Sequence, residues 1–394
     1  MRILLANKFY YPRGGDCIYT LQLESLLKSK GHHVAVFAIQ HPQNQPNLFQ
    51  PYFPSEVSYS LGSKKFPLKT ALRPLGAKEV KQKFTALLND FQPEIVHLNN
   101  IHTHLSPVPA EIAHKKQIRV VWTLHDYKLL CPRYDCLRSG MTCRLCFSNK
   151  FNALKYKCMK NSLSASILAY AEAKKWNKEK LEKYADVFIC PSEFMKSQML
   201  AGKFGEEKLK VLPNFVSIRG NDFVNYKRED YYCYVGRLSE EKGIETLLQT
   251  AKQLPYSLKI AGEGPLFDDL RNRYENDKIK FLGYLNREEI KSLIEKARFS
   301  VIPSEWFENN PLSGIESLHL GTPVLGANIG GIPELIEETK NGLLFESGNK
   351  ESLKNKIEEM VCSTFDYTDI AQKAQKKYSS NYYYTSLMNI YCGK

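Results

Sequence analysis

The chain has 394 residues, of which 43% are hydrophobic and 25% are charged. This composition excludes a disordered chain, and the length favours two domains over one compact core. No apolar run reaches the ~18 residues that cross a bilayer, and the first residues resemble a short strand and not a secretory leader. We therefore expect a cytoplasmic protein whose ten cysteines are thiols or metal ligands, because disulfides are rare in that compartment.

The net charge of +13 is distributed unevenly. Residues 1–213 contain 32 basic and 16 acidic side chains, whereas residues 214–394 contain 23 basic and 26 acidic side chains. A surplus confined to the first half suggests an anionic partner there, such as membrane lipid, a phosphorylated acceptor or nucleic acid. A solvated basic surface without a partner is the alternative. No stacking motif is interleaved with the basic residues, so we do not expect nucleic acid.

Short apolar runs alternate with helical stretches along the first half. We expect strands at residues 2–6, 34–38, 94–98, 120–124 and 187–190, and helices at 20–30 and 164–184. Continuous apolar strands separated by helices predict a parallel sheet covered on both faces. The lysine-rich second half of helix 164–184 suits either an anionic membrane or solvent. The long connection from Gln40 to Leu75 is expected to be functional or mobile.

Two strand ends of this half carry candidate ligand-binding groups. Gly14 and Gly15 lie between the first strand and the first helix, where glycines allow close approach of a ligand or simply form a turn. The spacing is not G-x-G-x-x-G, which disfavours a nicotinamide cofactor. His125 follows a later strand, at the edge where open α/β sheets bind ligands, although a structural histidine is also common at such a place.

Five cysteines occur between residues 131 and 158. Cys143 and Cys146 form a C-x-x-C pair, a spacing typical of zinc sites, but the remaining spacings are irregular. The candidate ligands of a structural zinc ion are Cys131, Cys143, Cys146 and Cys158. Plain reduced thiols are the alternative interpretation.

The second half repeats the alternation of strands and helices. We expect strands at residues 232–235, 258–261, 279–282, 299–302 and 323–326, which predicts a second doubly wound domain. Glycines or charged side chains follow four of these strands: Gly236, Arg237 and Lys242; Gly262 and Gly264; Gly283 and Tyr284; and Glu308. Because the carboxyl ends of parallel strands share one edge, this row predicts a ligand-binding cleft.

A helix start lies at the end of this row. Asn310 precedes Pro311, which predicts an asparagine cap and a proline at the first helical position. Free backbone N–H groups at such a start attract an anion. Glu308 and Glu316 lie on either side of it, and their carboxylates either accept hydrogen bonds from the hydroxyls of a sugar or ribose or simply favour the first helical turn.

The spacing of Glu308 and Glu316, followed by Gly321-Thr322-Pro323 and Gly330-Gly331-Ile332-Pro333-Glu334, resembles the signature of glycosyltransferase family 4. Val235 to Leu238, Ala261 to Pro265 and Leu212 to Asn214 add to the resemblance. It implies an α/β protein of GT-B fold, with two doubly wound Rossmann-like domains that face each other across a cleft. The implied parts are an acceptor-side domain 1–213 with a cysteine-containing insertion at about 131–158, a nucleotide-sugar-binding domain 214–372, and a C-terminal helix 373–394 that crosses back.

The resemblance implies a retaining hexosyltransferase that needs no cofactor. Its donor is a nucleotide-diphosphate sugar, with a UDP-sugar as the first expectation and GDP-mannose as the second. By resemblance Arg237 and Lys242 neutralise the diphosphate, Glu316 holds the ribose, and Glu308 with His125 holds the transferred sugar. The implied backbone and loop contacts to the donor are Gly14, Gly15, Gly236, Gly262, Gly264, Gly283, Tyr284, Asn310, Pro311 and Leu312.

The acceptor is expected to be a glycan or a lipid-linked molecule in polysaccharide or glycolipid biosynthesis. The basic first half beside Phe9, Tyr10 and Tyr11 suits an acceptor displayed at an anionic membrane, so we expect peripheral contact with the inner face of that membrane. A soluble acceptor is the competing view. A sugar-nucleotide epimerase or a phosphorylase can share this fold, and a non-catalytic basic binding protein is a further alternative.

Overall fold

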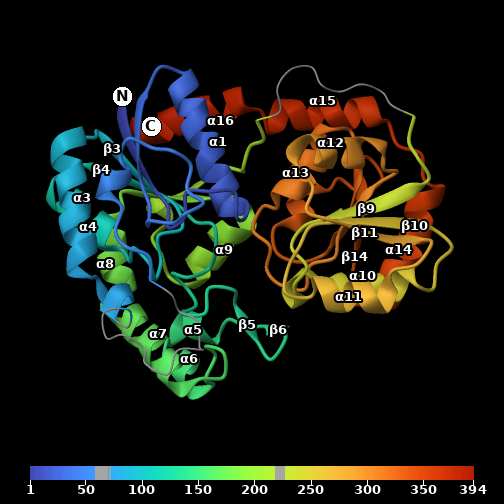
Figure 1. Ribbon diagram of the computed structural model, residues 1–394, viewed down its shortest axis with the longest axis horizontal. Helices are drawn as coiled ribbons and strands as arrows, with labels where there is room; N and C mark the ends of the chain where they lie inside the picture. The colour runs from blue at the N-terminus through green and yellow to red at the C-terminus, as the bar shows by residue number, and fades with distance from the viewer. Residues whose placement is uncertain (58–69, 71, 218–226) are drawn as a thin grey trace. The chain divides into compact units, whose positions relative to one another are not determined.

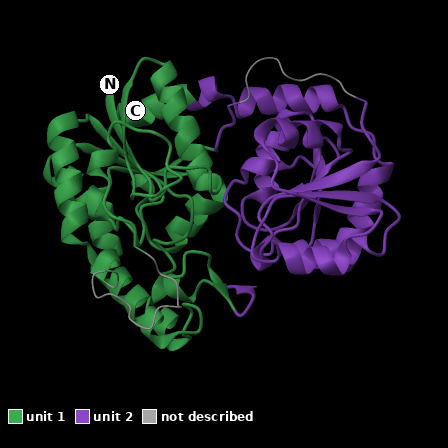
Figure 2. Ribbon diagram, in the orientation of Figure 1, with its two compact units in different colours: residues 1–138, 143–213, 384–394 green, residues 139–142, 214–383 purple. Residues whose placement is uncertain are grey.

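The computed structural model describes residues 1–57, 70, 72–217 and 227–394. The chain forms two compact units (Figure 2): the first contains residues 1–138, 143–213 and 384–394, and the second contains residues 139–142 and 214–383. The chain leaves the first unit after residue 213 and returns to it at residue 384. Residues 58–69 and 71 of the predicted long connection lie outside the described residues.

The first unit is built on a six-stranded parallel sheet with the strand order β2-β1-β3-β4-β7-β8. The strands are β1 (Arg2–Ala6), β2 (His33–Phe37), β3 (Ile95–Leu98), β4 (Arg119–Thr123), β7 (Val187–Cys190) and β8 (Leu209–Val211). Ile3, Leu4 and Leu5 in β1 are completely buried, as expected for a strand covered on both faces. The predicted parallel sheet is confirmed, and β8 is an additional edge strand.

Figure 1 shows the helices of the first unit. They are α1 (Gly15–Ser29), α3 (Lys78–Phe91), α4 (Val108–Lys115), α5 (Leu145–Ser148), α6 (Asn152–Lys155), α7 (Leu163–Lys175), α8 (Lys178–Tyr184) and α9 (Glu193–Ala201). The prediction of one helix over 164–184 is wrong. Trp176 is buried and its indole N–H donates to the carbonyl of Pro74 at 2.8 Å, while Asn177 caps α8 by accepting from the backbone N–H of Lys180.

The second unit contains another six-stranded parallel sheet, in the order β11-β10-β9-β12-β13-β14. Its strands are β9 (Tyr231–Val235), β10 (Ser257–Ala261), β11 (Ile279–Gly283), β12 (Ser300–Ile302), β13 (Val324–Ala327) and β14 (Gly342–Phe345). Tyr232 and Phe299 stack in the core with ring centroids 5.1 Å apart. The second predicted doubly wound sheet is thus confirmed, with β14 as a further strand.

The helices of this unit are α10 (Ile244–Ala251), α11 (Phe267–Tyr274), α12 (Arg287–Lys296), α13 (Leu312–His319), α14 (Lys350–Cys362) and α15 (Tyr367–Lys377). The last helix, α16 (Ser380–Tyr391), ends in the first unit. There the buried Tyr391 hydroxyl lies 2.6 Å from Nδ1 of His97, and His97 Nε2 lies 2.7 Å from the Thr123 hydroxyl. These buried hydrogen bonds anchor the aromatic C-terminal segment on β3 and β4.

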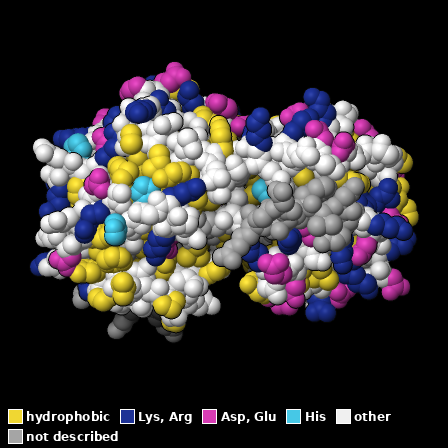
Figure 3. Space-filling view, turned by 90° about the horizontal axis from the view of Figure 1, so that it is seen from above, with side chains coloured by type: hydrophobic (Ala, Val, Ile, Leu, Met, Phe, Trp, Pro, Cys, Tyr) yellow, Lys and Arg dark blue, Asp and Glu magenta, His cyan; other side chains and the backbone are white. Residues whose placement is uncertain are grey.

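The surfaces of the two units differ in the mixture of side chains. On the face shown in Figure 3, acidic and basic side chains are interspersed over the second unit, while apolar side chains form larger patches on the first. Among the described helices, none is both long enough and apolar enough to cross a bilayer.

Candidate active site

The loops after β9, β10 and β11 lie against one another at the carboxyl edge of the second sheet. Gly236 N–H donates to the carbonyl of Ala261 at 3.0 Å, and Gly262 N–H donates to the carbonyl of Gly283 at 2.8 Å. The row of strand ends predicted from the sequence is therefore continuous from Gly236 to Gly283.

Two glycines of this row are required by the packing of backbone on backbone. Gly262 has φ +128°, and a Cβ atom there would lie 2.0 Å from the carbonyl oxygen of Gly236. A Cβ at Gly264 would lie 2.3 Å from the carbonyl oxygen of Leu238. Only glycine fits at either place, so these residues shape the edge by allowing neighbouring loops to touch.

An ion pair joins the loops after β9 and β12. The Nζ atom of Lys242 lies 2.6 Å from Oε1 of Glu308, and the Ser304 hydroxyl donates to the same oxygen at 2.7 Å. The Glu308 side chain is 8% exposed and that of Lys242 is 26% exposed. Burial raises the pKa of Glu308, but the charge of Lys242 and these hydrogen bonds outweigh it, so the pKa lies below its usual value. Glu308 is therefore a carboxylate at neutral pH.

Close backbone contacts hold both partners of this pair in place. Lys242 ends the short 3₁₀ helix η4 (Glu240–Lys242), and Gly243 follows with φ +64°, where a Cβ would lie 1.8 Å from the carbonyl oxygen of Pro303. On the other side, Gly331 N–H donates to the carbonyl of Glu308 at 2.8 Å. The Gly330-Gly331 pair singled out in the sequence thus supports the Glu308 loop.

Arg237 differs from its neighbours because its guanidinium is not engaged. The residue is exposed, and within the described part of the chain its side chain forms no hydrogen bond or ion pair. Its carbonyl accepts a hydrogen bond from the Tyr234 hydroxyl at 2.8 Å, which fixes the backbone after β9. A cation on a fixed backbone, with no described protein anion beside it, is suited to bind an anionic ligand.

The predicted cap of α13 is wrong by one residue. The helix begins at Leu312, Pro311 occupies the cap position in an extended conformation (φ −66°, ψ 122°), and no side chain caps the helix. Asn310 is engaged elsewhere: its Oδ1 accepts from the backbone N–H of Asn214 at 2.8 Å, and its carbonyl accepts from the Asn214 side chain at 2.8 Å. Asn310 therefore anchors the residue that follows the Leu212-Pro213 junction.

Glu316 lies one turn into α13 and is partly exposed. The surrounding protein desolvates its carboxyl group and raises the pKa to about 7, although Arg287 acts in the opposite direction. Near pH 7 this group exists in both protonation states, and each state can hydrogen-bond a hydroxyl. The neighbouring candidate Tyr284 is 73% exposed, at the end of β11.

In the first unit, His125 follows β4. Its Nε2 atom lies 3.0 Å from Oδ1 of Asn99, and its ring meets that of Tyr19 edge-on with centroids 4.7 Å apart. Burial lowers the pKa of His125 to about 4, so the imidazole is neutral at pH 7. With Nε2–H donating to Asn99, Nδ1 is the acceptor. Asn99 was missed in the sequence, although it directly follows β3 and the same strand-end rule identifies it.

Gly14 has a different environment from the glycines of the second unit. It precedes α1 with φ −167°, and its carbonyl accepts from the N–H of Ile18 at 2.9 Å. An added Cβ would meet only the Asp16 carboxylate, at 3.5 Å, which is an ordinary contact. Packing among the described residues therefore does not demand a glycine at position 14.

The aromatic residues expected to face a membrane are buried. Phe9, Tyr10 and Tyr11 are each 9% exposed or less. The Tyr10 hydroxyl donates to Glu24 at 2.7 Å, and the Tyr11 ring stacks on His41 at 4.4 Å. The expectation that this loop offers an aromatic surface is therefore wrong, because its rings fill the space between the first helix and the following loop.

The cysteine segment was predicted to provide the ligands of a structural zinc ion. All ten cysteines are free, and no group of three or more His, Cys, Asp or Glu side chains is placed to hold a metal ion among the residues the structure describes. Cys131 and Cys146 are buried, whereas Cys143 and Cys158 are partly exposed. The side chains of Cys136 and Cys146 hydrogen-bond with that of Cys131, and the structural zinc ion stays a prediction.

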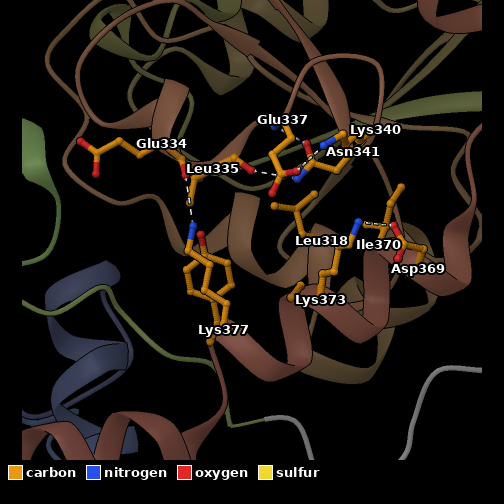
Figure 4. A pocket seen from close by; sticks show the side chains of 12 residues that line it. Leu318, Glu334, Leu335, Glu337, Lys340, Asn341, Asp369, Ile370, Lys373 and Lys377 are labelled. Atoms are coloured by element: carbon orange, nitrogen blue, oxygen red, sulfur yellow. Dashed lines mark hydrogen bonds and ion pairs between the residues drawn. The ribbon is translucent and has the colours of Figure 1, made fainter.

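One small cavity, of about 120 Å³, lies elsewhere on the second unit. It is formed by α13, the 3₁₀ helix η5 (Ile332–Leu335) and α15 (Figure 4). None of the candidate residues lines it, and its rim carries the ion pairs Lys373–Asp369 at 2.7 Å and Lys340–Glu337 at 3.4 Å. We interpret it as a depression between charged surface side chains, separate from the candidate site.

Comparison with known proteins supplies the family. Residues 13–219 match the family described as Glycosyltransferase Family 4, and residues 221–377 match Glycosyl transferases group 1. An uncharacterized glycosyltransferase of Methanocaldococcus jannaschii is 29% identical over 182 residues, which are 45% of this chain and 50% of that protein. The O-antigen biosynthesis glycosyltransferase WbnH of Escherichia coli is 29% identical over 220 residues, which are 54% of this chain and 63% of that protein.

The crystal structure of Anabaena HepE in complex with UDP-glucose has the same fold. The TM-score is 0.67 at 17% sequence identity, over 100% of this chain and 99% of that chain. Both parallel sheets are part of the match, which confirms the GT-B fold expected from the sequence. With family matches that together span most of its length, the chain belongs to Glycosyltransferase Family 4 and is a glycosyltransferase of GT-B type.

Proposed function

We propose that this glycosyltransferase moves a hexose, with retention of configuration, from a nucleotide-diphosphate sugar to a glycan or a lipid-linked acceptor. The observation that supports this most is the charged edge of the second sheet. Arg237 is an exposed cation without a partner among the described residues, and Lys242 is held 2.6 Å from the buried carboxylate of Glu308. One edge thus offers positive charge for a diphosphate and a fixed carboxylate for hydroxyl groups.

The chemistry assigned to these residues is explained by the charge that develops during transfer. Breaking the bond between the sugar and the diphosphate leaves negative charge on the diphosphate, which Arg237 and Lys242 stabilise. The acceptor hydroxyl attacks the anomeric carbon from the face that the diphosphate leaves, and a diphosphate oxygen takes the hydroxyl proton. No protein nucleophile is needed, and every bond that breaks is balanced by one that forms.

The two glutamates have separate roles in this proposal. Lys242 and Ser304 both donate to Oε1 of Glu308, and we assign Oε2 to a hydroxyl of the transferred sugar. Glu316 is assigned to the ribose hydroxyls. Neutral His125, with its Nδ1 atom as acceptor, is assigned to the transferred sugar as the family resemblance implies.

A UDP-sugar is the first donor to test, because HepE of the same fold was solved with UDP-glucose. GDP-mannose is the second. Polysaccharide or glycolipid assembly is the process we propose, since the relative WbnH is an O-antigen biosynthesis enzyme. Peripheral contact with an anionic membrane is part of this proposal when the acceptor is lipid-linked.

A thermal-shift screen of nucleotide sugars tests the proposal. A donor present at ~100 times its dissociation constant should stabilise the protein by about 2.7 kcal/mol. The stabilising donor is then incubated with membrane extract or oligosaccharides, and the anomeric configuration of the product is read by NMR. Transfer without added phosphate, with the donor configuration kept, is the expected result. Strict dependence on phosphate, epimerised donor or an inverted product would contradict the proposal.

A further inference from the structure

The segment between Asp135 and Glu172 contains more basic residues in a row, without an acidic one between them, than any other part of the chain. It contains six basic residues and no acidic residue: Arg138, Arg144, Lys150, Lys155, Lys157 and Lys160. Lys155, Lys157 and Lys160 are exposed, and none of them forms an ion pair with an acidic residue in the described ranges. This local charge is therefore not neutralised by the described part of the protein.

Large apolar side chains are exposed in the same segment. Residues 134–167 hold seven of the fifteen large hydrophobic side chains that are exposed in the described chain. Five of the seven belong to the first unit and follow Arg138: Leu145, Phe151, Tyr156, Leu163 and Ile167, with exposed fractions of 40% to 53%. Single exposed apolar residues are ordinary, but a cluster of this kind indicates an interaction surface.

Helix α7 presents its apolar side outward. Leu163 and Ile167 are four residues apart and therefore lie on one face, where they are 53% and 49% exposed. The side of α7 turned toward the protein carries Ser166, Ala169 and Glu172, all buried. A surface helix of a globular protein normally shows the reverse pattern, with its apolar stripe on the core.

Described contacts link the short helices that carry these side chains. The Phe151 ring meets the Tyr170 ring edge-on at 5.7 Å, and Tyr170 lies one turn beyond Ile167 on α7. The side-chain amide of Asn152 donates to the carbonyl of Leu145 at 2.9 Å. Figure 1 shows α5, α6 and α7 grouped together. We call this surface the docking face: Leu145, Phe151, Tyr156, Leu163 and Ile167, with Lys155, Lys157 and Lys160.

We infer that the docking face binds the surface of an anionic lipid bilayer. Aromatic and aliphatic side chains enter the headgroup region, while neighbouring lysines meet lipid phosphates. Tyr156 combines both features, because the Arg138 guanidinium lies 4.7 Å and the Lys155 ammonium 5.4 Å from its ring centroid. A second copy of this chain would bring the same uncompensated positive charge, so charge complementarity favours the bilayer.

This inference replaces the lysine-rich end of helix 164–184 as the membrane contact. Lys175 donates to the carbonyl of Leu75, and Lys178 donates to the carbonyl of Lys203 at 2.9 Å and lies 3.2 Å from Glu182. These ammonium groups are held by contacts within the fold, so they are less available to a lipid phosphate than the lysines of the docking face. The inference deepens the proposed lipid-linked acceptor and rests on it in that respect, but vesicle binding itself needs neither a donor nor sugar transfer.

Co-sedimentation of the full chain with vesicles tests the inference. We expect binding to vesicles that contain about a third phosphatidylglycerol, little binding to pure phosphatidylcholine, and release as salt shortens the Debye length from about 8 Å toward 3 Å. Each lysine near an anionic surface strengthens binding about fivefold, which corresponds to about 1 kcal/mol. The triple variant Lys155→Glu, Lys157→Glu, Lys160→Glu should therefore lose on the order of 100-fold in partition coefficient.

Matched controls separate the docking face from net charge and from unfolding. Lys252→Glu, Lys278→Glu, Lys350→Glu makes the same charge change at exposed lysines of the second unit and should retain most of the binding. The pair Leu163→Ser, Ile167→Ser should weaken binding, whereas Leu48→Ser, Leu200→Ser at exposed positions elsewhere in the first unit should not. All four variants should keep the unfolding temperature and the donor-induced thermal shift.

Several outcomes overturn the inference. Equal loss in both lysine triples attributes binding to overall charge, and unchanged binding in the docking-face variants places it elsewhere. Binding to DNA or self-association without vesicle binding assigns the face to another partner. If no nucleotide sugar stabilises the protein but vesicle binding depends on the docking face, the inference stands and the proposed donor chemistry fails.

Discussion

The candidate residues at the carboxyl edges of the two sheets differ in charge. At the second sheet, Arg237 and Lys242 are cations and Glu308 is a carboxylate held at 2.6 Å from Lys242. At the first sheet, burial lowers the pKa of His125 to about 4, so its ring is neutral, with the charges of Asp16 and Lys8 nearby. A diphosphate needs fixed countercharge, whereas a sugar hydroxyl needs only a well-placed acceptor or donor. Two sheets of similar topology thus carry different residues at their strand ends, which agrees with the roles proposed for them.

The glycines of the two edges differ in the space that surrounds them. Gly262 and Gly264 are demanded by neighbouring backbone, while Gly14 has room for a Cβ atom. Glycine in the second unit therefore explains the architecture of the edge. Glycine at position 14 has no such reason within the described protein, as expected for a residue kept small for a ligand.

The largest effect is expected for Lys242→Ala, which tests whether the second edge stabilises the negative charge of the diphosphate. Turnover should fall at least ~100-fold because a donor to the developing charge is lost. Stability should fall by about 2–4 kcal/mol, since buried Glu308 loses its partner. Steady-state kinetics and urea unfolding measure the two effects. Adding Glu308→Gln should restore much of the stability but not the turnover; recovery of both would remove the catalytic role.

Arg237→Ala should lower turnover by a similar factor, on the order of 100-fold, while leaving stability within about 0.5 kcal/mol. The reason is that its side chain has no partner within the described residues whose loss would cost folding energy. Arg271→Ala is a suitable control, because this exposed arginine pairs with Glu275 on the surface of α11. A near-normal rate for Arg237→Ala would show that the edge does not neutralise the donor.

Glu316→Gln tests whether Glu316 contacts the ribose of the donor while Glu308 contacts the transferred sugar. Donor affinity should fall about tenfold, as expected for a lost charged hydrogen bond, with a smaller change in turnover. Glu308→Gln should instead lower turnover more than affinity. Isothermal titration with donor and steady-state rates distinguish the two. Identical profiles would leave the two glutamates without separate roles.

The raised pKa of Glu316 also predicts a pH dependence. In the folded, donor-free protein the ionised form is disfavoured, so the stability from this group is present below pH 4.5 and is lost as pH rises through about 7. At pH 8 Glu316→Gln should therefore raise the free energy of unfolding by roughly 1–3 kcal/mol, and at pH 4.5 the difference should vanish. Donor affinity of the unmodified protein should improve between pH 6 and pH 8. A flat profile would contradict the assignment.

The last comparison concerns the glycines. Gly262→Ala should cost about 2–3 kcal/mol of stability, because its Cβ would meet the Gly236 carbonyl. Gly14→Ala should change stability by less than about 0.5 kcal/mol and lower donor turnover instead. Thermal unfolding and kinetics of the matched pair provide the comparison. A stable and fully active Gly14→Ala variant would favour the alternative interpretation, that this loop is an ordinary strand-to-helix turn without a role in donor binding.

The two parallel sheets and most of their strands are predictable from the amino-acid sequence alone. Apolar runs such as Arg2 to Ala6 and Val187 to Cys190 are bounded by polar residues, so local pattern suffices to place them. The row of candidate residues from Gly236 to Glu308 could also be predicted from the sequence, because residues that follow parallel strands share one edge of the sheet. Asn99 was accessible by the same rule and was overlooked.

The partners of these residues, by contrast, emerge only from the folded chain. Trp176 follows α7 and donates a hydrogen bond to the carbonyl of Pro74, about a hundred positions earlier. Asn310 accepts a hydrogen bond from Asn214 instead of capping its own helix. Phe9 is buried while Leu163 is exposed, although local periodicity predicts neither. The physical reason is that the free energy of burying an aromatic ring, or of hydrogen-bonding a buried amide group, depends on partners that are distant in the sequence. A short stretch of sequence does not contain those partners.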